Sequence, residues 1–153
     1  MSASAIAIPV HMLAAVAWVG GMFFAYMILR PALAGMEPPQ RLVLWQGVFD
    51  HFFPWAWAAA FLLPMTGYWM VQMDMGGFRN AGLHVHIMHG LGILMLLLLV
   101  SLYGSLYRRF VVAVAAGDWP AAGARIAAIR RIVGINLILG IVTIVIGSSG
   151  RLW

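Results

Sequence analysis

The chain has 153 residues, of which 64% are hydrophobic and 8% are charged, whereas a soluble domain carries about 25% charged residues. Its net charge of +5 includes nine arginines and no lysine, and the arginines flank apolar stretches instead of forming a nucleic-acid-binding stripe. The absence of cysteine excludes disulfides, thiolate metal sites and iron–sulfur clusters.

The first apolar stretch runs from about residue 5 to 29, and a bilayer is crossed by about 20 such residues. The Ala-Leu-Ala segment at 32–34 mimics a signal-peptide cleavage site. However, residues before the stretch carry no basic group, and the stretch is too long for a signal-peptide core. We therefore expect a retained helix. Ala17, Gly21 and Ala25 repeat at four-residue spacing, which predicts close packing inside the chain.

Three more stretches of spanning length follow, at about residues 52–73, 83–107 and 132–149. Prolines, glycines and an asparagine mark the connections between them. Pro64 lies inside the second stretch, where it removes one backbone hydrogen bond. The sequence thus predicts a single all-α domain over residues 1–153. We expect an integral membrane bundle of four transmembrane helices.

The arginines predict how this bundle is oriented. The first connection holds two of them and the third holds five, whereas the second connection and the C-terminus hold one each, Arg79 and Arg151. Positively charged loops stay in the cytoplasm. Both termini and the second connection are therefore predicted to face the periplasm of a bacterial inner membrane.

Four histidines are predicted to lie near that periplasmic face. His11 falls about 9 Å into the first helix and His89 about 7.5 Å past His84 in the third, so the two have similar depth. His86 and His89 share a helix face, whereas His84 points elsewhere. Ionisable groups are costly in hydrocarbon, so this cluster indicates a functional site.

Imidazoles from two facing helices can ligate a heme iron from both sides. We predict that His11 pairs with one imidazole of the third helix, and the residues leave open which one. Trp18 follows His11 by seven residues, and Arg79 or Arg151 would pair with the heme propionates. The predicted cofactor-binding residues are His11, His84, His86, His89, Trp18 and Arg79, with the four histidines as metal ligands.

Copper is the alternative cofactor. His84 and His86 form a His-x-His pair, and four methionines fall near the same surface. Imidazole and thioether suit both common oxidation states of copper, although most methionines in lipid are apolar filler. A packing subunit without a cofactor is the third reading. The methionines in question are Met70, Met73, Met75 and Met88.

Residues 11–21 (HMLAAVAWVGG), followed by Arg30 and Pro31, resemble the first helix of the copper-resistance protein D (CopD) superfamily and of the related HemJ-type protoporphyrinogen oxidases. Residues 83–86 (LHVH) are similar to the start of the third HemJ helix, and residues 130–140 resemble the last CopD helix. The resemblance implies a four-helix inner-membrane protein. It implies heme b and protoporphyrinogen oxidation for HemJ-type members, and copper handling and uptake for CopD members.

By this resemblance, His11 and His84 match the families' histidines, and two positions depart. The HemJ lysine is His86 here, which argues against that oxidase reaction, and an acidic residue of the last CopD helix is Asn136, which argues against copper permeation. We therefore expect a heme b-binding membrane protein with a redox role. It would transfer electrons with a quinone-type partner or act as a heme-dependent membrane oxidoreductase. Membrane lipid is an expected partner and nucleic acid is not.

Overall fold

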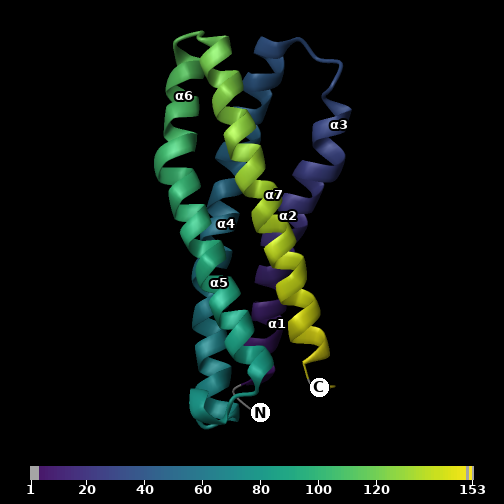
Figure 1. Ribbon diagram of the computed structural model, residues 1–153, viewed down its shortest axis with the longest axis vertical. Coiled ribbons are helices and arrows are strands. Elements are labelled where there is room, and N and C mark those ends of the chain that lie inside the picture. The colour runs from purple at the N-terminus through teal and green to yellow at the C-terminus, as the bar shows by residue number, and fades with distance from the viewer. Residues whose placement is uncertain (1–3, 151, 153) are drawn as a thin grey trace.

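The structure is a computed structural model that describes residues 4–150 and residue 152 (Figure 1). Its elements are helices, and the described part contains no strand. They form four long rods, and short connections join each rod to the next. The first rod comprises α1 (Ser4–Ala15), η1 (Val16–Gly20), α2 (Gly21–Phe23), η2 (Phe24–Leu29) and α3 (Arg30–Ala32). The others are α4 (Pro38–Asp74), then α5 (Leu83–Ser101) with η4 (Leu102–Tyr107) and α6 (Arg108–Ala115), and finally α7 (Trp119–Ser149).

Consecutive rods run in opposite directions along the bundle. The start of α1 and the end of α7 lie at one end of the bundle, together with the connection that holds the 3-10 turn η3 (Phe78–Asn80) (Figure 1). The connections at 33–37 and 116–118 lie at the other end (Figure 1). α1 packs on α4, whereas α5 and α6 pack on α7, which also contacts α4. The arginine-rich connections and the histidine-bearing helix ends are therefore at opposite ends of the molecule.

Three helical segments of the described chain are long and apolar enough to cross a membrane: Ser4–Ala32, Leu83–Ala115 and Trp119–Ser149. This confirms the prediction of an all-α, multi-pass membrane protein. α4 is a longer helix but is not among these candidates. Its polar residues include Gln46, Asp50 and Gln72, which lower its hydropathy.

The helices extend beyond the apolar stretches from which they were predicted. α4 begins at Pro38 instead of near residue 52, and α6 continues to Ala115. Hydropathy marks where a chain crosses lipid, but glutamine and arginine are also good helix formers, so a helix continues past that boundary. α7 begins as soon as Asp118 caps it, with Asp118 Oδ1 accepting from the Ala121 amide at 3.0 Å. Gly117 ends the preceding helix with a φ of 67°.

Gly21 brings the first rod close to α4. A Cβ at this position would lie 2.2 Å from Cε2 of Phe52. Phe52 itself packs on the main core, in which Trp18 is 3% exposed. The predicted close packing of the small-residue face is therefore confirmed at Gly21.

We expect Gly21→Ala to lower the free energy of unfolding by about 1–3 kcal/mol, because the new methyl displaces the Phe52 ring. Thermal unfolding in detergent micelles measures the effect. Gly20→Ala is the matched control, since a Cβ at Gly20 meets no atom within 4 Å. Equal unfolding midpoints for the two variants would contradict the packing described here.

Candidate functional site

His11 is held against α4 by a hydrogen bond. Its Nδ1 lies 2.8 Å from Oγ1 of Thr66, and that hydroxyl donates to the Leu62 carbonyl at 2.6 Å. Because the Thr66 proton is already used, His11 Nδ1–H is the donor to Thr66, which leaves Nε2 with a free lone pair. Gly67 makes room beside the ring: a Cβ there would lie 3.5 Å from His11 Cε1.

His86 and His89 lie in an aromatic cluster formed with α4 and η3. The Phe78 ring is centred 5.2 Å from His89 and 5.9 Å from His86, and the Tyr68 ring is 5.4 Å from His89. The Tyr68 hydroxyl is 3.4 Å from His89 Nδ1, a long hydrogen bond. His86 is exposed and His89 half-buried. Tyr68 and Phe78 were not predicted from the sequence as site residues, because aromatic residues are common throughout this chain.

His84 packs on a different helix. A Cβ at Gly150 would lie 2.3 Å from Cγ of His84, so this imidazole lies against the C-terminal end of α7. Of the three imidazoles of α5, one therefore packs on α7 and the other two pack on η3 and α4, whereas His11 is hydrogen-bonded to α4. Among the residues described by the structure, no three His, Asp or Glu side chains converge closely enough to hold a metal ion.

The remaining predicted cofactor residues also lie apart. Trp18 is buried in the core of the bundle, and Arg79 is exposed on η3. Arg151 lies outside the described residues. Asp74, near Arg79 in the chain, accepts hydrogen bonds from the Ser4 hydroxyl on both carboxylate oxygens, which joins the start of α1 to the end of α4.

The contact between α5 and α7 brings soft metal-ligating side chains against glycines. His84, Met88 and Met95 are four and seven residues apart, so they share one face of α5. They lie opposite Gly150, Gly147 and Gly140 of α7 in that order. A Cβ at Gly147 would be 3.0 Å from Sδ of Met88, and one at Gly140 would be 3.2 Å from Cε of Met95. We call these six residues the α5–α7 seam.

Asn136 continues the seam one turn further along α7. Its side chain is 4% exposed, and within the described residues its Oδ1 is the only buried side-chain polar atom without a hydrogen-bond partner. Leaving such an atom unpaired costs about 1–3 kcal/mol. An unpaired buried oxygen is a place where a water molecule or an ion can bind. Met95, which is 4% exposed, packs nearby against Gly140.

The chain was compared with known protein families, curated proteins and solved structures. The family model described as copper resistance protein D matches residues 46–149, which is more than half of the chain. The matched region includes most of α4, all of α5 and α7, and therefore the whole seam except Gly150. No curated protein and no solved structure matches the chain.

We expect Thr66→Val to release His11, because valine has the shape of threonine without its acceptor oxygen. The loss should lower the free energy of unfolding by about 1 kcal/mol. The ¹⁵N resonances of the imidazole should change from a single Nδ1–H tautomer to a mixture. Thr66→Ser keeps the hydroxyl and is the matched control. Imidazole resonances that stay unchanged in Thr66→Val would show that Thr66 does not orient His11.

Proposed function

We propose that this chain, which belongs to the copper resistance protein D family, binds copper ions as its cargo and passes them along the α5–α7 seam. The observation that carries the proposal is the alignment of one imidazole and two thioethers on a single face of α5, each against a glycine of α7. Family membership supports copper as the ion.

The seam suits the chemistry of Cu(I). Thioether and imidazole are ligands that this soft cation accepts, and both are neutral. His84 stands at the start of α5, Met88 about 6 Å further in and Met95 about 10 Å beyond Met88, at the usual helical rise. Ligands at successive depths that each bind loosely allow an ion to enter and also to leave.

Asn136 fits this proposal as an oxygen donor at the inner end of the seam. By the resemblance described above, Asn136 replaces an acidic residue of the last CopD helix. From the sequence alone, this replacement argued against copper permeation. The buried, unpaired Oδ1 of Asn136 weakens that argument, because an amide oxygen still offers a lone pair to a cation. The substitution replaces a charged ligand by a neutral one.

The first contact with copper is proposed to occur at the exposed residues around the start of α5. His86 is exposed, and Met73 on the last turns of α4 is 57% exposed, so both are accessible to an arriving ion. His86 would meet the ion first, and His84, which lies on the seam face of α5, would bind it before it moves to Met88. This step uses the histidines and outer methionines for which the sequence analysis gave copper as the alternative cofactor.

The proposed topology has four membrane spans, with α4 as the fourth, and termini in the periplasm of a bacterial inner membrane. The support is the arginine distribution, since the connections with the most arginines meet at one end of the bundle (Figure 1). The imidazoles at the opposite end would then face the periplasm. Copper entering there would move along the seam toward the bilayer centre.

The heme b reading receives less support from the side-chain contacts. It needs His11 and one third-helix imidazole to face the same iron. His11 hydrogen-bonds Thr66 on α4, and His89 packs on Tyr68 and Phe78. The redox role with a quinone partner depends on that heme and is not proposed here, and the likeness to HemJ-type oxidases remains a prediction.

We expect the double variant Met88→Leu/Met95→Leu to bind Cu(I) at least about tenfold more weakly, because leucine keeps the volume but removes both sulfur ligands. Competition with a chromogenic Cu(I) chelator in detergent measures the affinity. Met12→Leu is the control, since Met12 is 62% exposed on α1, away from the seam. Unchanged Cu(I) affinity in the double variant would overturn the seam as the copper path.

We expect Asn136→Leu to have opposite effects on stability and on copper transfer. Removing the unpaired Oδ1 should raise the free energy of unfolding by about 1 kcal/mol or more. Copper accumulation by cells that express the variant should fall. Thermal unfolding and elemental analysis of washed cells measure the two quantities. A variant that is less stable and transports copper normally would show that Asn136 has a packing role only.

A further inference from the structure

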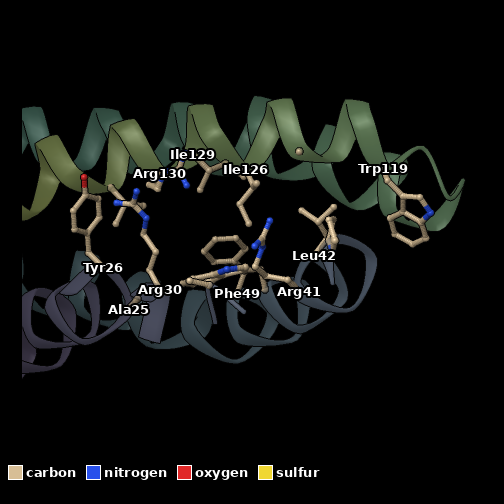
Figure 2. Close-up of a pocket in the computed structure, with 15 residues that line it drawn as sticks. Ala25, Tyr26, Arg30, Arg41, Leu42, Phe49, Trp119, Ile126, Ile129 and Arg130 are labelled. Carbon is tan, nitrogen blue, oxygen red and sulfur yellow. The ribbon is translucent and has the colours of Figure 1, made fainter. Parts of the chain in front are cut away.

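A cavity of about 430 Å³ lies at the arginine-rich end of the bundle, opposite the end that holds the histidines of α1 and α5. It lies between the first rod and α4 on one side and α7 on the other, and is partly open at the surface (Figure 2). Its floor is apolar and consists of the buried side chains of Leu42, Phe49 and Ile129. The copper proposal makes no use of this cavity.

Among the residues that the structure describes, three guanidinium groups line the cavity and no acidic side chain does. They come from three separate elements: Arg30 from α3, Arg41 from α4 and Arg130 from α7. Figure 2 shows their side chains in the space between the two helical layers. Arg30 also lies over the Tyr26 ring, with Cζ 5.4 Å from the ring centroid. Three like charges around one space favour an anion among them.

The shape of the cavity indicates an elongated amphiphile instead of a small ion. Its lining on α7 runs from Trp119 to Val133, which is about 21 Å of helix. Trp45 and Trp119 also line the cavity, and tryptophan is the residue that membrane proteins place at the lipid headgroup level. The three guanidinium groups therefore border an apolar surface along the cavity.

We propose that this cavity binds an anionic phospholipid. Its phosphate would lie among Arg30, Arg41 and Arg130, and the first part of an acyl chain would lie on Leu42, Phe49 and Ile129. Guanidinium groups bind phosphate through paired hydrogen bonds, and basic pockets between membrane helices accept acidic headgroups. A zwitterionic lipid fits less well, because its own cation would add to the three positive charges.

Native mass spectrometry of the full chain in neutral detergent tests the proposal. Phosphatidylglycerol and phosphatidylcholine with identical acyl chains are the probes, each at the same concentration. We expect a one-to-one phosphatidylglycerol adduct at least about fivefold more abundant than the phosphatidylcholine adduct. Arg130→Gln should reduce it about fivefold, the effect of one basic residue near an anionic headgroup.

Arg131→Gln is the matched control, since Arg131 is the exposed neighbour of Arg130 in α7 and does not line the cavity. It should leave the adduct unchanged. If Arg130→Gln does not fold, Arg130→Lys serves instead, with partial loss expected because lysine keeps the charge without the paired donors.

Three results would overturn the proposal. Equal adducts with both lipids would show that the cavity does not select anionic headgroups. Equal losses in Arg130→Gln and Arg131→Gln would indicate diffuse surface charge. Full displacement of phosphatidylglycerol by millimolar inorganic phosphate would show that the site binds the free anion and that the apolar floor contributes nothing.

Discussion

The packing of α5 against α7 depends on two glycines of α7 that lie opposite the methionine side chains of α5. Met88 and Met95 approach positions that a Cβ at Gly147 or Gly140 would occupy. A larger residue at Gly147 would displace the end of Met88, and one at Gly140 would displace Val19 and the end of Met95. Helix pairs in lipid gain no hydrophobic free energy from association, so this close fit is what holds them together. The same glycines therefore determine both the stability of the contact and the alignment of the possible ligands.

The two ends of the bundle have opposite chemical character. One end carries imidazoles and thioethers, which are neutral and bind soft cations. The other carries most of the arginines, three of which surround an apolar-floored cavity. A cation moving along the seam meets neutral donors at the first end and a positive field at the second. Under the copper proposal, this separation would relate copper binding to the orientation of the chain in the membrane.

Sequence reasoning predicted what depends on composition and spacing along one helix. The apolar stretches, the short connection after Asp74 and the close packing at Gly21 follow from hydropathy and side-chain size. Helix ends were less predictable, because residues such as Gln40 and Arg41 continue a helix outside lipid. Spacing gives the depth of His11, but not the neighbour toward which its ring turns; that depends on Thr66, 55 residues further along the chain. Met95 was missed because methionine counts as apolar filler in a hydropathy pattern. The similar spacings, four and seven residues in α5 against three and seven for the glycines, were the signal that would have revealed it.

X-ray absorption at the copper edge tests the central claim most directly. The purified chain, loaded with one equivalent of Cu(I), should give a spectrum that contains sulfur scatterers as well as imidazole nitrogen. Sulfur is the discriminating element, because methionine is its only source in a chain without cysteine. A spectrum fitted by nitrogen and oxygen alone would contradict copper binding in the seam. Copper binding in the seam would also be contradicted if the purified chain retained no copper and showed the intense Soret band of a bound heme.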